Sequence, residues 1–187
     1  MVRTFADQPV DRVALERILS NGQRGPSAGF TQGIAFLVLE GAERTGAFWD
    51  AATGHDPDRR GEGLRAAPVL ILPLSSKQAY LDRYAEPDKG WTDRDEARWP
   101  APFWDVDAAF ATMLMLLTVV DEGLGALFFG LYPETISAVK AVFRVPDEWD
   151  PIGGLAIGRA AAVDPVRSSA HSRPRRTPED VVHWGHW

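Results

Sequence analysis

The segment from Trp104 to Glu122 limits the possible folds of this chain more than any other. Its middle, from Ala108 to Val120, is a nearly unbroken apolar run, and Gly123-Leu124-Gly125 follows the segment. A helix without a polar face must be buried all round, by the core or by a second subunit. The run is shorter than the roughly 20 residues that a bilayer requires. We therefore expect a long buried central helix around which the other elements pack.

The composition is that of one soluble domain. The chain has 187 residues, 45% of them apolar, which is enough for one core and too short for two domains, so we expect a single domain over 1–187. With 20 basic and 26 acidic residues it is a poor partner for nucleic acid or anionic membrane. It lacks cysteine, which excludes disulfides, thiolate catalysis and cysteine-ligated metals. No secretory signal is visible at the N-terminus, and a cytoplasmic location is the default.

Helix and strand patterns alternate along the chain. Beyond the long helix, helices are predicted at 11–22, 43–52, 75–84 and 133–143, the last with Ile136, Val139 and Val142 facing inward. Strands are predicted at 34–39, buried on both faces, at 69–72, ended by Pro73, and at 126–129 and 152–157. A polar loop at 54–63, an ordered aromatic excursion at 86–103 and a C-terminal arm at 164–187 complete the chain. This order predicts a sheet flanked by helices, of the α+β or α/β class.

The stretch from Arg24 to Gly33 is the strongest candidate for a functional site. Gly25-Pro26-Ser27-Ala28-Gly29 matches G-x-S-x-G, the nucleophile elbow of serine hydrolases. That elbow needs a strand before the serine and a helix after it, because the strained turn exposes the hydroxyl at the end of a sheet. Here a predicted helix precedes the stretch and a predicted strand follows it. The histidines also lie in polar loops or in the tail, so a serine hydrolase is a distant alternative.

Three other chemistries are disfavoured. The Gly123-Leu124-Gly125 segment follows a helix where a dinucleotide fingerprint requires a strand, so it is better explained as a helix end. No lysine follows a glycine as a Walker A motif demands. His183 and His186 lack a nearby carboxylate cluster, and we predict no metal site.

Five segments, in order along the chain, resemble those of the nitroreductase family. The resemblance covers nearly the whole chain, and it is the ordered set rather than any one motif that is specific. The segments are Arg3-Thr4-Phe5 with Pro9-Val10; Pro26-Ser27-Ala28-Gly29-Phe30-Thr31-Gln32; Trp104-Asp105-Val106-Asp107 leading through the long helix to Gly123-Leu124-Gly125; Val145-Pro146 with the strand ending at Ile157-Gly158; and the arm from Arg173 to Val182.

The resemblance implies an α+β homodimer with a central mixed sheet and an FMN in each of two sites at the subunit interface. It implies an oxidoreductase that uses NAD(P)H to reduce small electron-poor acceptors such as nitroaromatics, quinones or activated alkenes. The cofactor carries this chemistry, so no catalytic residue is predicted. Arginines bind phosphate bidentately and are the expected partners of the FMN phosphate. The implied cofactor contacts are Arg3, Pro26, Ser27, Ala28, Gly29, Phe30, Gln32, Phe128, Phe129, Gly130, Arg175 and Arg176.

The chain departs from the family pattern at three places. Phe30 stands where the family usually has a flavin-contacting asparagine, and Gly33 replaces the usual Pro-Trp after Gln32. The first arginine of the N-terminal motif would fall before Met1, so either the native start lies upstream or phosphate binding relies on the tail arginines. These departures leave room for a deazaflavin in place of FMN. They also leave an alternative function, a flavin- or deazaflavin-binding protein of the same fold without nitroreductase turnover.

Overall fold

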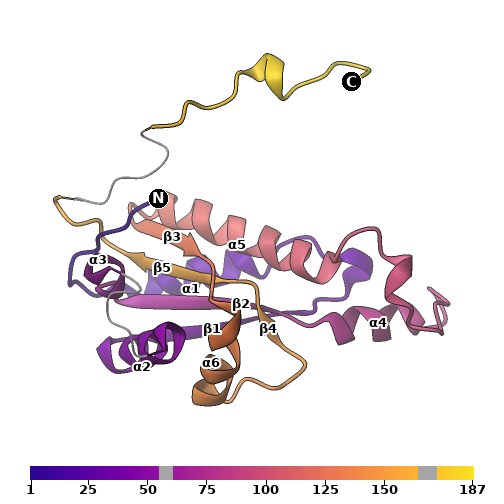
Figure 1. Ribbon diagram of the computed structural model, residues 1–187, viewed down its shortest axis with the longest axis horizontal. Coiled ribbons are helices and arrows are strands. Elements are labelled where there is room, and N and C mark those ends of the chain that lie inside the picture. The colour runs from indigo at the N-terminus through magenta and orange to yellow at the C-terminus, as the bar shows by residue number, and fades with distance from the viewer. Residues whose placement is uncertain (55–60, 164–171) are drawn as a thin grey trace.

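A five-stranded sheet forms the centre of the fold (Figure 1). The structure is a computed structural model that describes residues 1–54, 61–163 and 172–187. Most of the loop predicted at 54–63 and the first part of the predicted arm lie outside the described residues. The strands are β1 (Ile34–Glu40), β2 (Val69–Ser75), β3 (Gly125–Phe129), β4 (Asp150–Pro151) and β5 (Gly154–Gly158).

The sheet has the order β1-β2-β5-β3, with the short β4 also paired to β2. Every one of these pairings is antiparallel. The α+β class is confirmed, but the mixed sheet that the resemblance implied is not what this single chain forms. The two edges, β1 and β3, have no parallel neighbour among the described residues.

Strand β2 is the buried centre of the sheet. All seven of its residues are buried, and Leu70 and Leu72 pack on the opposite face from Val69 and Ile71, as the period of a strand requires. The prediction that Pro73 ends this strand is wrong. The Pro73 carbonyl oxygen accepts from the Ile152 amide at 3.1 Å, so the Pro73 nitrogen also faces the side of β2 that pairs with β4 and β5. Pro73 lies at the point where the partner of β2 changes from β5 to β4. The missing N–H therefore falls at a break between partner strands, where it costs little.

Helices cover both faces of the sheet, so the fold has three layers. One face carries α1 and α5, and the other carries α2 and α6 (Figure 1). The edge strand β1 is half-buried along most of its length, so the prediction that it is buried on both faces is wrong. The helices are α1 (Arg12–Gly22), α2 (Ala42–Thr53), α3 (Glu62–Arg65), α4 (Lys77–Ala85), α5 (Phe103–Asp121) and α6 (Ile136–Phe143).

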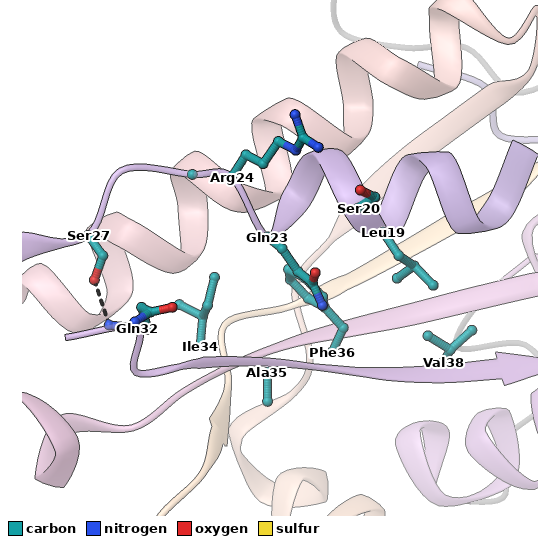
Figure 2. Close-up of a pocket in the computed structure, with 11 residues that line it drawn as sticks. Leu19, Ser20, Gln23, Arg24, Ser27, Gln32, Ile34, Ala35, Phe36 and Val38 are labelled. Carbon is teal, nitrogen blue, oxygen red and sulfur yellow. Dashed lines mark hydrogen bonds between the residues drawn. The ribbon is translucent and has the colours of Figure 1, made fainter. Parts of the chain in front are cut away.

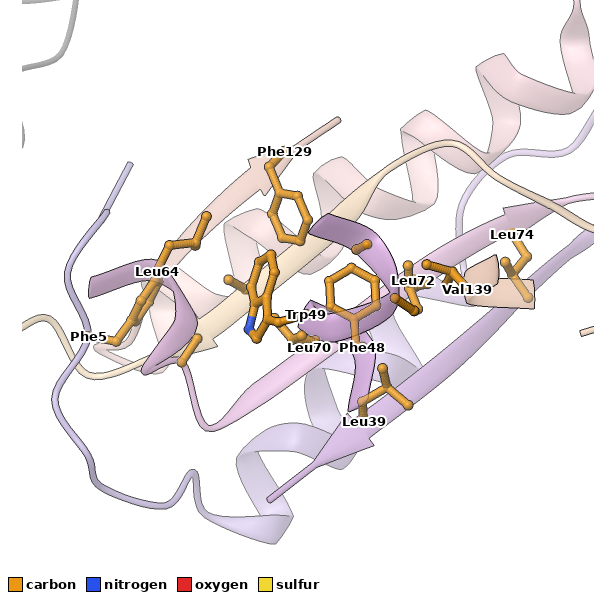
Figure 3. Close-up of a cluster of buried hydrophobic side chains, with 14 residues drawn as sticks. Phe5, Leu39, Phe48, Trp49, Leu64, Leu70, Leu72, Leu74, Phe129 and Val139 are labelled. Atoms are coloured by element: carbon orange, nitrogen blue, oxygen red, sulfur yellow. The ribbon is translucent and has the colours of Figure 1, made fainter. Parts of the chain in front are cut away.

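An aromatic cluster fills the core on the α2 side (Figure 3). The Trp49 ring lies with its centroid 4.9 Å from that of Phe48 and 5.2 Å from that of Phe129. Val139 of α6 is buried in the same cluster, as predicted, whereas Val142 is exposed and its predicted inward position is wrong. A helix of two turns buries only a narrow stripe, and Val142 lies outside that stripe.

The long apolar helix is confirmed as α5. It packs on α1 and on the sheet, and Ala108, Ala111, Met115 and Val119 are completely buried there. Its end is a left-handed glycine, Gly123, with φ +67°, and the Leu124 amide donates to the Val119 carbonyl at 3.0 Å. This bond belongs to a Schellman motif. The helix end that the Gly-Leu-Gly pattern predicted is therefore confirmed. By length and composition α5 could also cross a membrane, but the core helices of soluble proteins share this property, and one face of α5 packs on α1 and the sheet.

The opposite side of α5 remains uncovered within one chain. Phe110, Met113, Leu117 and Val120 are between 48% and 72% exposed and recur at intervals of three and four residues, which places them in one stripe. We refer to these four residues as the α5 stripe. The described part of the arm, residues 172–187, is likewise exposed throughout and extends away from the sheet (Figure 1).

Candidate functional site

The loop from Arg24 to Gly33 lies between the end of α1 and the start of β1. The Arg24 and Gly25 amides donate to the last carbonyl oxygens of α1 at 3.1 Å, so the chain leaves the helix in a defined direction. At the other end, the Gly33 carbonyl accepts from the Ser76 amide, the cap of α4, at 3.0 Å. The predicted order of helix, loop and strand is confirmed. It is the reverse of the order that a serine elbow requires.

The middle of this loop has an unusual backbone. Gly29, Phe30 and Gln32 all have left-handed conformations, with φ values of +62°, +52° and +56°. Left-handed backbone costs a residue with a Cβ about 1–2 kcal/mol. Two hydrogen bonds within the loop help to hold the shape: the Gln32 amide donates to Ser27 Oγ at 2.8 Å and Thr31 Oγ1 donates to the Ala28 carbonyl at 2.6 Å. Backbone strain of this kind tends to cluster at functional sites.

Beneath the loop lies a buried carboxylate. Asp107 on α5 is only 3% exposed, and its Oδ2 atom accepts from the Ala28 amide and from the Tyr80 hydroxyl, each at 2.7 Å. Burial, with a further contribution from Asp107, raises the pKa of Tyr80 well above its ordinary value, while a hydrogen bond with Ser27 opposes that rise. Tyr80 therefore stays a hydrogen-bond donor at neutral pH. The stability from this shift is complete below about pH 10 and is lost as the pH rises further.

Two glycines of the loop lie against tyrosine rings of α4. A Cβ at Gly33 would lie 2.6 Å from the Tyr80 ring, and one at Gly29 would lie 2.7 Å from the Tyr84 ring. Arg83 Nε also donates to the Gly29 carbonyl at 3.1 Å. The small residues of the loop thus permit close contact with α4, and this contact fixes the position of the loop relative to that helix.

The aromatic excursion predicted at 86–103 is ordered and continues this surface. Trp99 is its centre, with ring centroids 4.4 Å from Tyr84, 5.5 Å from Trp91 and 6.0 Å from Tyr80. Arg98 pairs with Asp93 at 2.6 Å within the excursion. The excursion is therefore built onto the same two tyrosines that support the loop.

A cavity of about 680 Å³ lies beside the loop, between α1 and β1 (Figure 2). Figure 2 shows the Ser27–Gln32 hydrogen bond at one end, with Leu19, Phe36 and Val38 toward the other. The cavity has the size of a cofactor site, and it combines apolar walls with hydroxyl, amide and guanidinium groups. These residues fit a ligand with a flat apolar ring and a polar chain. Its lining residues are Leu19, Ser20, Gln23, Arg24, Gly25, Ser27, Gln32, Ile34, Ala35, Phe36 and Val38.

A model of the Nitroreductase family matches residues 1–159 of the chain. The chain belongs to the nitroreductase family. It is similar to the NADPH-dependent oxidoreductase of Staphylococcus aureus, with 23% identity over 97% of this chain and 68% of that protein. Its fold is similar to that of the NfrA1 nitroreductase from B. subtilis, with a TM-score of 0.73, 18% identity, and coverage of 98% of this chain and 70% of that one. It is also similar to an FMN-dependent nitroreductase from Clostridium difficile R20291, with a TM-score of 0.68, 17% identity, and coverage of 100% and 94%.

Half of the cofactor contacts implied by the resemblance lie together on the loop from Arg24 to Gly33. Ser27 and Gln32 line the cavity, and Phe30 stands out from the loop with 76% of its surface exposed. The members of this group are Pro26, Ser27, Ala28, Gly29, Phe30 and Gln32.

The remaining implied contacts are dispersed within one chain. Phe129 is buried among Phe48 and Trp49 in the core, Phe128 is half-buried on the other face of the sheet, and Gly130 is exposed at the end of β3. Arg3 lies near α3, since a Cβ at Gly63 would be 3.0 Å from the Arg3 carbonyl oxygen. Arg175 and Arg176 lie on the exposed arm, where Arg176 donates to the Asp180 carbonyl. Their roles at a cofactor stay predictions.

Sequence reasoning missed two residues of the site, Asp107 and Tyr80. Asp107 was visible as the acidic residue at the start of an otherwise apolar run, and a charged residue inside a buried helix must find hydrogen-bond donors. Tyr80 sits in a short helix whose pattern gives no sign of its partner. Its role became visible only when α4 and α5 were brought together.

Proposed function

We propose that this chain binds FMN and is an NAD(P)H-dependent oxidoreductase that reduces electron-poor acceptors, with nitroaromatics, quinones and activated alkenes as the classes to test. Membership of the nitroreductase family supports a flavin-type NAD(P)H oxidoreductase. The FMN-dependent nitroreductase of similar fold supports FMN as the flavin. The three similar proteins give no support for a deazaflavin, which therefore enters only as an outcome of the test.

The observation that carries the proposal is the fixed loop beside the cavity. Its backbone runs through small residues at Ala28 and Gly29, which allow close approach of a flat ligand, and its shape is set by bonds to α4 and α5. Bound FMN would supply hydride transfer between NAD(P)H and the acceptor. The residues of this chain would bind and orient, and no side chain is required to act as an acid or base.

A homodimer is the second part of the proposal. The α5 stripe is a contiguous apolar face on a helix whose opposite side is buried, and such faces mark interaction sites. The exposed arm carries Val181, Val182, Trp184 and Trp187, which are also uncovered in one chain. We propose that a second copy covers these surfaces, and that Arg175 and Arg176 of one copy bind the FMN phosphate in the site of the other.

The test is a titration of the flavin-free protein with FMN, followed by flavin fluorescence. We expect saturable binding by the parent protein and weaker binding by Ser27→Ala. Ser137→Ala is the matched control, because Ser137 is an exposed serine of α6 away from the loop. Absence of FMN binding by the parent contradicts the proposal, and binding of a deazaflavin alone would change the cofactor. FMN binding without any reduction by NADH or NADPH would favour a flavin-binding protein without turnover.

A further inference from the structure

Asp107 is the one charged side chain that is buried among the residues the structure describes. Burial of a carboxylate is strongly unfavourable unless hydrogen bonds compensate for the lost water. No cation forms an ion pair with Asp107 in the described part of the chain. Its compensation comes from two donors, the Ala28 amide and the Tyr80 hydroxyl.

Both donors connect Asp107 to the loop from Arg24 to Gly33. The Ala28 amide belongs to the loop itself, at the point where the left-handed segment begins. The Tyr80 ring lies against Gly33, where the loop ends, at a separation that leaves no room for a Cβ. One oxygen on α5 therefore anchors the start of the segment 28–33 directly and its end through Tyr80.

We propose that Asp107 is a positioning residue for the FMN-binding loop, and that it acts through the Ala28 amide and the Tyr80 hydroxyl. The identity of the cofactor in this inference rests on the proposed function, whereas the anchoring of the loop rests on the structure alone. A loop held in its binding shape before the ligand arrives binds more tightly, because the ligand does not have to order it.

Substitutions can separate this role from a general effect on folding. Asp107→Ala removes the acceptor from both donors. Asp107→Asn removes the charge but keeps one acceptor oxygen, and both hydrogen bonds use a single oxygen, so it should restore the anchor. Thr112→Val is the matched control, because Thr112 is as buried, lies on the same helix, and donates only to the Ala108 carbonyl of its own helix.

The experiment measures two quantities for each folded variant. Hydrogen exchange of the peptide covering residues 26–33, in flavin-free protein, reports the order of the loop. FMN titration reports the consequence for binding. We expect Asp107→Ala to speed exchange in this peptide and to weaken FMN binding by about tenfold or more, since two hydrogen bonds that hold the loop are lost. Asp107→Asn and Thr112→Val should remain close to the parent in both measurements.

Tyr80→Phe keeps the test decisive if Asp107→Ala does not fold. It removes one donor, preserves the ring against Gly33, and should also speed exchange in the loop peptide. Parent-like exchange in Asp107→Ala, or in Tyr80→Phe where it is the only folded variant, would overturn the inference. An Asp107→Asn variant as impaired as Asp107→Ala would overturn it too. If the parent binds no FMN, the proposed function fails, while the exchange measurement still decides whether Asp107 holds the loop.

Discussion

Replacing Gly29 by alanine perturbs the loop in two separable ways. The residue has a φ of +62°, a conformation that side chains with a Cβ rarely adopt, and the new Cβ would lie 2.7 Å from Cε2 of Tyr84. The first effect is a backbone cost and the second is a steric clash. Other glycines of the chain carry one of these effects, or neither, so the two can be measured apart.

The expected cost follows from these two contributions. Left-handed backbone with a Cβ costs about 1–2 kcal/mol, and overpacking a filled site costs about 1–3 kcal/mol. Tyr84 is half-buried and can move in part, which reduces the clash. We therefore expect Gly29→Ala to lower the free energy of unfolding by about 2–4 kcal/mol. That is a large share of the roughly 5–15 kcal/mol by which domains are stable.

Urea unfolding of four variants at one protein concentration makes the comparison. Gly123→Ala has the strained φ of +67° and no neighbour within 4 Å, so it should cost only the backbone part, about 1–2 kcal/mol. Gly33→Ala has no strained φ but meets the buried Tyr80 ring at 2.6 Å, so it should cost about 1–3 kcal/mol. Gly46→Ala, in open space inside α2, should stabilise by about 0.5–1 kcal/mol.

The ranking of the variants decides whether this reasoning is sound. A Gly29→Ala variant as stable as the parent would show that the left-handed loop does not exist in solution. A Gly29→Ala cost equal to that of Gly123→Ala, together with a neutral Gly33→Ala, would show that the tyrosines do not press on the loop.

Three further predictions concern the dimer, the phosphate and the response to acid. Leu117→Glu should convert the proposed homodimer to monomers, because a charge would be buried in the α5 stripe. Light scattering of the parent and the variant measures this, and a variant that is still dimeric would place the interface elsewhere. Joint replacement of Arg175 and Arg176 by alanine should weaken FMN binding by about 1.5–3 kcal/mol, and unchanged affinity would show that the phosphate is held by other groups. The Arg98 guanidinium holds the pKa of Asp93 below its ordinary value. The stability that this pair contributes is present at neutral pH and is lost as the pH falls below about 4, so Asp93→Asn should differ from the parent at pH 7 and converge with it in acid.

The elements that were predicted well have strong local signals. The largely apolar composition of α5 is visible in its own sequence, and Gly123 marks its end without reference to the rest of the fold. The loop from Arg24 to Gly33 was found because its glycines and proline interrupt two regular patterns. Its position after a predicted helix and before a predicted strand then disfavoured a serine hydrolase.

The errors concern properties that depend on neighbouring elements. Pro73 was expected to end a strand, but whether a missing N–H matters depends on which partner lies opposite, and the sequence does not reveal that β4 and β5 meet there. The burial of β1 was overestimated because its place at the edge of the sheet is a property of the topology.

The candidate site likewise has a part that local sequence signals predict and a part that depends on how distant elements pack. Residues of the loop are contiguous in sequence and are together in the structure. Arg3, Phe128 and Arg175 come from distant parts of the chain: Arg3 lies near α3, Phe128 lies on β3, and Arg175 lies on the exposed arm. If the site lies between two copies, no pattern within a single chain could have revealed their juxtaposition.

The central claim is that FMN on this protein exchanges electrons with NAD(P)H. It is tested most directly by adding NADH or NADPH to the FMN-loaded protein without oxygen and following the visible absorbance of the flavin. The account predicts that at least one of the two bleaches the flavin, and that a quinone or nitroaromatic acceptor restores the colour. Bound flavin that neither nucleotide reduces would contradict it.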